Sequence, residues 1–211
     1  MTSSDWLQNA LIGIPILLLS LTVHEFFHAW TAHKYGDDTA KDLGRLSLNP
    51  LVHLDLWGSI VMVASGFRFG WAKPVPVNPM NLRNPRTADI WISAAGPLSN
   101  LGLAIIFGIV FRMLTTMTGI PEAAYLVIAR GVLINLLLAF FNLIPLFPLD
   151  GSHILRNLVP PDMEATIDKF NMVSPLLLLA LIYFGAIGIV LGPVIYPLIP
   201  LIGGNAIIAY L

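Results

Sequence analysis

The feature that most constrains this chain is a cluster of ionisable residues at the end of a membrane-like apolar run. Residues 6–23 read WLQNALIGIPILLLSLTV without one charge, and His24-Glu25-Phe26-Phe27-His28 follows directly. A bilayer's hydrocarbon takes about 20 apolar residues to cross. Ionisable side chains in such a span are costly and mark a functional site by default. The sequence therefore predicts a membrane helix with a polar site built into it.

The spacing of the two histidines favours a metal site. Residues four apart on a helix share a face, so the imidazoles of His24 and His28 can converge on one ion. Glu25 lies beside the first histidine, where it can take a proton from a metal-activated water. We predict an intramembrane zinc site with Glu25 as general base. The alternative is that both histidines donate to backbone carbonyls and bind no metal. A chance occurrence of this motif is less expected in a membrane helix than in a soluble helix, because ionisable residues in lipid are costly.

Composition supports the membrane setting and limits the metal's ligands. Hydrophobic residues make up 56% of the chain and charged residues 11%, against about 25% charged in ordinary soluble domains. A net charge of −1 provides no basic surface, so nucleic acid is not expected as a partner. The chain has no cysteine, so a zinc ion must use nitrogen and oxygen ligands, which suits a catalytic site.

The predicted fold is an all-α integral membrane protein with about five to six transmembrane helices, forming one domain over residues 1–211. We expect a core at 6–160 and C-terminal spans at 170–211. Apolar runs predict helices over about 6–35, 90–111, 122–144 and 172–191. Gly192-Pro193 is expected to end the fourth of these. Pro197 and Pro200 then argue against a regular final helix.

A long polar insertion separates the first two predicted spans. Its apolar stretch at 54–67 is only about half a span long, so it predicts a re-entrant or interfacial helix. The following GWAKPVPVNP, at 70–79, predicts an extended edge strand or a loop because proline cannot continue a central strand. Residues 34–89 hold most of the Lys and Arg residues, namely Lys34, Lys41, Arg45, Arg68, Lys73, Arg83 and Arg86. The positive-inside rule therefore puts the insertion, and the nearby histidines, toward the cytoplasm.

The same topology brings the segment NLIPLFPLDG, residues 142–151, to the same side of the membrane at a similar depth. A catalytic zinc usually takes three protein ligands, and Asp150 is the best candidate for the third. The alternative for Asp150 is a helix N-cap, which is compatible with ligation. The amide of Asn142 can donate to an oxyanion or hold a substrate backbone; its alternative is an interhelical hydrogen bond.

Together, these segments resemble a known family. HEFFH, AGPLSN at 95–100 and NLIPLFPLDG look like the site-2 protease family of intramembrane zinc metalloproteases. GRLSLNPLVHLD, GWAKPVPVNP and NLRNPR further resemble its compact branch, which lacks a PDZ domain. The resemblance covers roughly residues 10 to 160. It implies His24, His28 and Asp150 as ligands of one Zn²⁺, Glu25 as general base, and Asn142 as a substrate- or oxyanion-contacting residue.

The expected function is a zinc metalloendopeptidase that cleaves membrane-spanning or membrane-anchored proteins near the cytoplasmic side. The expected location is a prokaryotic cell membrane, and the other partner is the lipid bilayer. Residues 71–78 are a candidate for holding an unwound substrate as an added strand, or else form a structural loop. Two alternatives remain: a metal transporter, which five histidines and mostly apolar spans disfavour, and a non-catalytic scaffold, which an intact Glu25 and Asp150 disfavour.

Three other histidines are expected to have structural or interfacial roles. His33 lies near the end of the first helix. His53 and Asp55 reach the site only if the apolar half-span folds back. His153 is expected to be a cytoplasmic helix residue. Because it lies three residues after Asp150, the alternative is that it approaches the zinc as a gate or a competing ligand.

Overall fold

Five long helices dominate the structure. This computed structural model describes the backbone of residues 3–64 and 70–211, and the side chains of residues 11–62 and 70–211. Within these residues five helices are long and apolar enough to cross a membrane. They are α1 (Ser3–Lys34), α4 (Pro85–Leu114), α5 (Glu122–Asn142), α7 (Glu164–Tyr183) and α8 (Ala186–Gly203). The prediction of an all-helical membrane protein with about five spans is confirmed.

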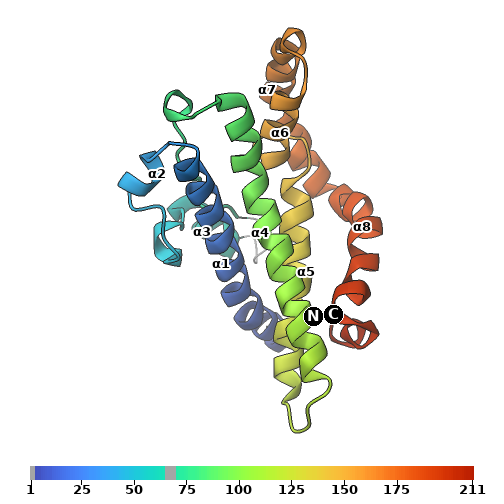
Figure 1. Cartoon of the computed structure of the whole chain (residues 1–211). Coiled ribbons are helices and arrows are strands. Elements are labelled where there is room, and N and C mark those ends of the chain that lie inside the picture. Colours follow the sequence, from blue (N-terminus) through green and yellow to red (C-terminus); the bar gives the residue numbers. More distant parts are fainter. Residues whose placement is uncertain (1–2, 65–69) are drawn as a thin grey trace.

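The two helices α4 and α5 form a central antiparallel pair (Figure 1). Helix α1 packs against α4 and α5 on one side, and α8 packs against α4 and α5 elsewhere on the pair. The short helix α6 (Asp150–Leu158) follows α5 and lies against α4. Helices α1, α4 and α6 therefore meet where the predicted metal ligands lie.

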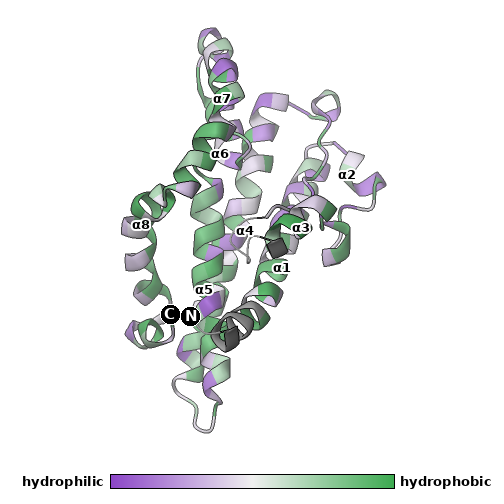
Figure 2. Ribbon diagram, turned by 180° about the vertical axis from the view of Figure 1, so that it is seen from behind, coloured by the Kyte–Doolittle hydropathy of each residue, from purple (hydrophilic) through white to green (hydrophobic). Residues whose placement is uncertain are grey.

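Close helix packing depends on small residues, as membrane helices favour. A β-carbon at Gly108 would lie 2.2 Å from Cγ2 of Ile202, and one at Gly131 would lie 2.7 Å from Cδ1 of Phe107. The buried apolar core around these crossings consists of Ala104, Phe111, Ala129, Val132, Leu136, Leu191, Ile195, Ile199 and Ile207. Figure 2 shows hydrophobic residues along α1, α5 and α8, while hydrophilic ones gather around the short helix α2 (Thr39–Asp42), the start of α4 and the α6–α7 turn. This distribution fits a band of lipid around the middle of the bundle.

The C-terminal boundaries differ from the sequence prediction. The fourth span ends at Tyr183, and the break lies at Gly185, which has a φ of 71°. Helix α8 then continues through Pro193, Pro197 and Pro200, so the expected break at Gly192-Pro193 and the irregular final segment are wrong. The spacing of four and three residues places the three prolines on one face, so the missing hydrogen bonds fall together. Neighbouring helices can compensate for such losses in a membrane.

The end of α8 is bonded to a cation of another helix. Arg112, at the end of α4, donates hydrogen bonds to the carbonyl oxygens of Leu201 (2.6 Å) and Ile202 (2.7 Å). The last carbonyls of a helix have no partner within it, and cations are favoured there. After α8, the 3₁₀ turn η4 (Asn205–Tyr210) returns to the bundle, and Tyr210 stacks on Tyr125 of α5 with ring centroids 5.2 Å apart.

The insertion between α1 and α4 contains four short helical segments. They are α2 (Thr39–Asp42), η1 (Pro50–Val52), α3 (Leu56–Ala64) and η2 (Pro79–Asn81). The predicted re-entrant segment at 54–67 extends over residues 65–69, which lie outside the described residues. Among the described residues of the insertion there is no strand, only one antiparallel bridge between Leu54 and Ala72. Prolines at 74 and 76 explain why pairing does not extend further.

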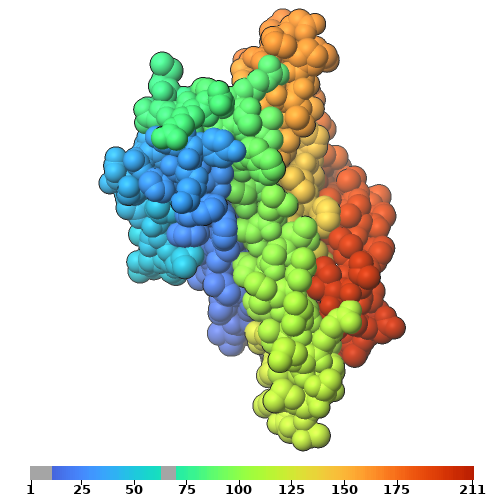
Figure 3. All heavy atoms as spheres, viewed as in Figure 1, coloured from blue at the N-terminus to red at the C-terminus, as the bar shows by residue number. Residues whose placement is uncertain are grey.

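A buried carboxylate fastens the insertion to the end of α1. Asp37 accepts hydrogen bonds from the backbone and hydroxyl of Thr39, from the backbone N–H of Asn78 (2.7 Å) and from the amide of Asn81 (2.9 Å). Arg45 is also buried and donates to the carbonyl oxygen of Lys73 at 2.5 Å. Figure 3 shows the insertion covering one flank of α1 near this end. These hydrogen bonds, together with the packing of Val77 and Leu82 against α1 and α4, hold the described part of the insertion without a continuous sheet.

Candidate metal centre

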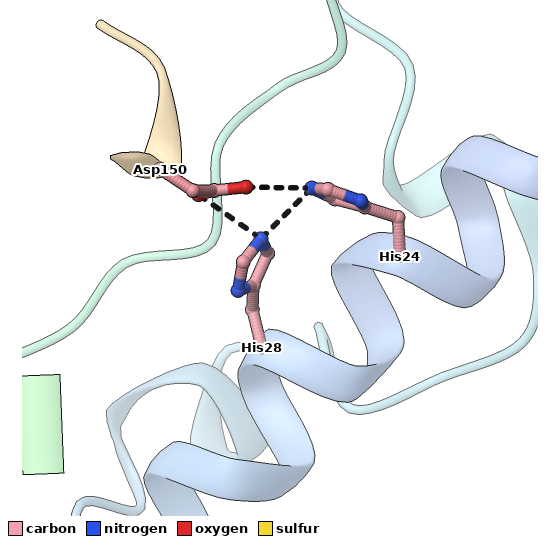
Figure 4. A group of neighbouring side chains, drawn as sticks. All are labelled: His24, His28 and Asp150. Atoms are coloured by element: carbon pink, nitrogen blue, oxygen red, sulfur yellow. Dashed lines mark hydrogen bonds and ion pairs between the residues drawn. The ribbon is translucent and has the colours of Figure 1, made fainter. Parts of the chain in front are cut away.

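Three potential ligands converge between α1 and α6. The Nε2 atoms of His24 and His28 lie 2.9 Å apart. Oδ2 of Asp150 lies 3.2 Å from Nε2 of His24, and Oδ1 lies 3.4 Å from Nε2 of His28. Figure 4 shows the two imidazoles projecting from adjacent turns of α1 toward the carboxylate. The helical spacing of four residues produces the histidine pair, and the start of α6 supplies the third group.

The Nδ1 atoms of both histidines, which face away from the cluster, each have a hydrogen-bond partner. Nδ1 of His24 lies 2.6 Å from Oδ1 of Asn100, and Nδ1 of His28 lies 2.7 Å from the carbonyl oxygen of Ile92. An amide or carbonyl oxygen only accepts, so each Nδ1 carries the hydrogen. In the neutral rings each Nε2 then presents a lone pair. Two nitrogen lone pairs and a carboxylate then face one another, an arrangement that a metal cation between them satisfies.

The donor set fits zinc. Zinc binds histidine nitrogen and carboxylate oxygen at about 2.0–2.2 Å, so neighbouring ligand atoms in a tetrahedral site are roughly 3.3 Å apart. The three separations in the cluster are close to this value. In addition, Oδ2 of Asp150 is buried and receives no hydrogen bond from any described residue. A buried acceptor without a donor is costly unless a cation satisfies it.

A glycine on α4 makes room for the cluster. A β-carbon at Gly96 would lie 2.4 Å from Nε2 of His28 and 2.6 Å from Nε2 of His24. Any larger residue would place a methyl group against the ligand atoms. The backbone of α4 at Gly96 therefore forms one wall of the site.

Packing at the start of α6 positions Asp150. The N-cap of α6 is Leu149, and Asp150 is the first helical residue, so the N-cap alternative is wrong. A carboxylate in the first turn is still favoured by the helix dipole. A β-carbon at Gly151 would lie 2.3 Å from the carbonyl oxygen of Leu143, so only glycine allows α6 to start this close to the end of α5.

The two predicted catalytic residues differ in their surroundings. Glu25 is 9% exposed and directly follows His24 in α1. Asn142 is the last residue of α5 and donates to the carbonyl oxygen of Leu138 in its own helix at 2.9 Å. This contact is neither the expected interhelical bond nor a contact with the cluster, and among the described residues Asn142 makes no other hydrogen bond. Its catalytic role stays a prediction.

The remaining candidates lie outside the cluster. His33 contacts Asp38 at 2.5 Å, and His53 is buried with Nε2 2.7 Å from the carbonyl oxygen of Ser47. Asp55 accepts from the backbone N–H of Gly58 at the start of α3. His153 pairs with Asp89 at 3.6 Å. Within the described part of the chain, only His24, His28 and Asp150 form a group that can hold a metal.

Sequence reasoning missed the buried contacts behind the ligands. Asn100 of α4 places its side-chain oxygen against His24 of α1, and Gly96 leaves room for both ligand nitrogens. The available signal was an uncharged polar residue, Asn100, in an otherwise apolar span, since such groups need a partner in lipid.

Comparisons with known proteins agree with this geometry. Residues 117–182 match the family described as Peptidase family M50. YwhC of Bacillus subtilis (strain 168), whose name describes a zinc metalloprotease, is 45% identical over 157 residues, which cover 71% of this chain and 69% of that protein. Zinc metalloprotease MJ0392 of Methanocaldococcus jannaschii is 30% identical over 141 residues, which cover 67% of this chain and 32% of that protein.

A mycobacterial relative is more distant. Rip2 of Mycolicibacterium smegmatis, also named as a zinc metalloprotease, is 29% identical over 166 residues, which cover 72% of this chain and 61% of that protein. No solved structure matches this chain.

Proposed function

The chain belongs to peptidase family M50, the site-2 protease family, and is a multi-pass zinc metalloprotease; from this premise we propose that it hydrolyses peptide bonds of membrane-spanning or membrane-anchored proteins. His24, His28 and Asp150 hold the Zn²⁺, and Glu25 is the general base. The observation that carries the proposal is the convergence of three acceptor groups without a donor between them.

The proposed chemistry divides between the metal and Glu25. Bound in this site, Zn²⁺ supplies a Lewis acid that polarises a peptide carbonyl and lowers the pKa of water. Glu25 accepts the proton of the attacking water and returns it to the leaving amine. Its carboxylate is suited to this because it is buried and directly follows His24 in α1. Asn142 is proposed to contact the substrate near the peptide bond that is cleaved.

An adjoining cavity of about 640 Å³ supports a membrane-derived substrate. One wall is the face of α1 that leads to Glu25, because Leu21 and Leu18 lie one and two turns before it on the same side of the helix. The other walls come from α5, the α7–α8 junction and the insertion, through Leu138, Phe141, Ile182, Gly185, Ile187, Gly188, His53, Leu54, Trp71 and Ala72. The lining is mostly apolar, which suits a segment arriving from lipid.

The insertion supplies a proposed contact for the substrate backbone. A peptide bond in a helix is shielded by its own hydrogen bonds, so the substrate must unwind before it is cleaved. Among the described residues, the extended segment 71–78 forms one β-bridge, and Trp71 and Ala72 line the cavity. We propose that this segment holds the unwound substrate as an added strand.

We propose that the site opens toward the cytoplasm of a prokaryotic cell. The insertion and the α6–α7 region lie at the same end of the bundle (Figure 1), and they carry Lys41, Arg45, Lys73 and Arg156. Positively charged loops favour the cytoplasmic side. The three relatives described above come from two bacteria and an archaeon, which supports a prokaryotic membrane as the location.

The test combines zinc content with cleavage of a reporter transmembrane substrate. The Glu25→Gln variant should keep its zinc and lose cleavage by about 10²–10⁴-fold, as expected for removal of a general base. The Asp150→Asn variant should bind zinc more weakly, because it loses a charged ligand. Zinc-loaded wild-type protein that cleaves no membrane substrate would contradict the proposal, and so would full activity in Glu25→Gln.

A further inference from the structure

A chain of buried amides connects α5, α4 and the ligand His24. We propose that Asn100 and Asn135 are positioning residues, which fix the proton and the ring orientation of His24 so that its Nε2 faces the metal. Both side chains are completely buried. They touch neither the cluster centre nor the cavity beside it, so any effect on the metal passes through His24. The proposal rests on the zinc site of the proposed function.

The orientation of Asn135 is set by the main chain. Its Nδ2 lies 2.9 Å from the carbonyl oxygen of Gly131, one turn earlier in α5. A carbonyl oxygen cannot donate, so the nitrogen and not the oxygen of this amide must face it. Oδ1 of Asn135 is therefore directed toward α4, where Nδ2 of Asn100 lies 3.0 Å away.

The orientation of Asn100 follows from two acceptors. Its Nδ2 donates both to Oδ1 of Asn135 and to the carbonyl oxygen of Ser20 in α1, at 3.1 Å. Reversing the amide would place oxygen against two oxygens. Oδ1 must therefore face Nδ1 of His24 at 2.6 Å, which gives that nitrogen the hydrogen and leaves the lone pair on Nε2.

The two histidines are held in different ways. His28 donates to the main-chain oxygen of Ile92, which no side-chain substitution removes directly. His24 depends on a side chain, Asn100, whose orientation depends in turn on Ser20 and Asn135. We therefore expect only His24 to be sensitive to substitutions at 100 and 135. Partners of this kind typically change metal affinity by about 10–100-fold when they are removed.

The test measures the zinc affinity of the purified full chain in detergent by competition with a chromogenic chelator. Asn100→Leu should weaken zinc binding by about 10–100-fold. Asn135→Leu should have a smaller effect, since Asn100 keeps its bond to Ser20. Asn100→Asp should bind zinc more tightly than Asn100→Leu, because it restores an acceptor for Nδ1 of His24. Cobalt-loaded samples provide a second readout, since the visible spectrum of Co²⁺ reports the geometry of its ligands.

The matched control is Ser174→Ala. Ser174 is a completely buried polar residue of α7, and its hydroxyl donates to the carbonyl oxygens of Phe147 and Asn171. The control should keep wild-type zinc affinity and the wild-type cobalt spectrum. Thermal melts of the metal-free proteins separate loss of the site from loss of the fold. If Asn100→Leu does not fold, the comparison of Asn135→Leu with wild type decides the question.

Three outcomes would overturn the inference. Wild-type affinity and an unchanged cobalt spectrum in Asn100→Leu would show that His24 needs no such partner. Equal losses in Asn100→Leu and Ser174→Ala would show a general effect of buried polar residues. Absence of zinc from the wild-type chain would overturn the proposed function as well, whereas zinc binding that survives Asn100→Leu overturns only the role of the two asparagines.

Discussion

A β-carbon at Gly96 would lie 2.4 Å from Nε2 of His28, although the two residues are on different helices and far apart in the sequence. Helix α4 thus approaches the ligand atoms as closely as a backbone can. The site depends on this approach, because the same helix holds both imidazoles from behind through Asn100 and the carbonyl of Ile92.

The first prediction concerns this contact. Gly96→Ala should lower zinc affinity by at least about 100-fold, because the methyl group must displace one imidazole from its ligating position. The measurement is zinc stoichiometry and affinity in detergent. The control is Gly102→Ala on the same helix, where a β-carbon meets nothing within 4 Å. Equal zinc affinity in the two variants would contradict the arrangement of α4 against the cluster.

A second prediction concerns the start of α6. Gly151→Ala should shift Asp150 away from the histidines, because the new methyl would lie 2.3 Å from the carbonyl oxygen of Leu143 and 2.5 Å from that of Ile144. We expect weaker zinc binding and a lower melting temperature together. The control is Gly13→Ala, since a β-carbon there has no neighbour within 4 Å. Unchanged zinc binding in Gly151→Ala would mean that α6 does not begin so close to α5.

A third prediction follows from the buried carboxylate of Asp37. Burial alone raises the pKa of this group, but the hydrogen bonds it accepts outweigh burial, so its pKa lies below the ordinary 3.8. A depressed pKa in the folded state adds stability above the unfolded-state value, and this stability is lost as the pH falls toward the folded-state value. The insertion should therefore loosen below about pH 4. Hydrogen exchange of residues 37–45 and 78–81 measures the loosening.

The same experiment has a variant that acts at neutral pH. Asp37→Asn removes an acceptor oxygen and places an N–H where donors converge, and should destabilise the insertion by about 1–3 kcal/mol. Asp42→Asn is the control, because Asp42 is exposed. Equal exchange rates in both variants would argue against the fastening role of Asp37.

A fourth prediction tests the extended segment of the insertion. Replacing residues 71–78 with a flexible linker should abolish cleavage of a reporter transmembrane substrate while zinc remains bound, because the unwound substrate loses its backbone partner. A linker that replaces residues 115–119, in the α4–α5 turn, is the control and should leave cleavage unchanged. Cleavage at the wild-type rate after replacement of 71–78 would assign this segment a purely structural role.

The grouping of His24, His28 and Asp150 was more predictable than the boundaries of the C-terminal helices. The spacing of His24 and His28 follows from helix geometry, and membrane topology alone brought Asp150 to the same depth. The break at Gly185 was not predicted, because glycine in an apolar run gives no sign of a positive φ, and the prolines after it look more disruptive than they are. The position where α8 ends also depends on contacts that join residues about ninety positions apart, such as those of Arg112 with Leu201 and Ile202.

The positions of the two asparagines were likewise beyond reach of the sequence. A polar residue in a span needs a partner, but many partners are available in a bundle of five helices. The way in which α1, α4 and α5 cross determines that Asn100 bonds to His24 and that Asn135 bonds to Asn100. The prolines of residues 70–79 likewise predicted an extended edge strand or a loop. They did not indicate that the described part of this segment forms one bridge, between Leu54 and Ala72.

The order of the ligands along the chain has a consequence for biosynthesis. His24, Glu25 and His28 enter the membrane with the first helix, but Asp150 follows more than a hundred residues later, at the start of a helix whose preceding loop packs against α7 through Leu146, Leu149 and Leu178. A growing chain that has inserted only its first three spans lacks the third ligand. Such a chain does not have the complete ligand set, so ribosome-stalled chains that end before and after Asp150 should differ in zinc retention.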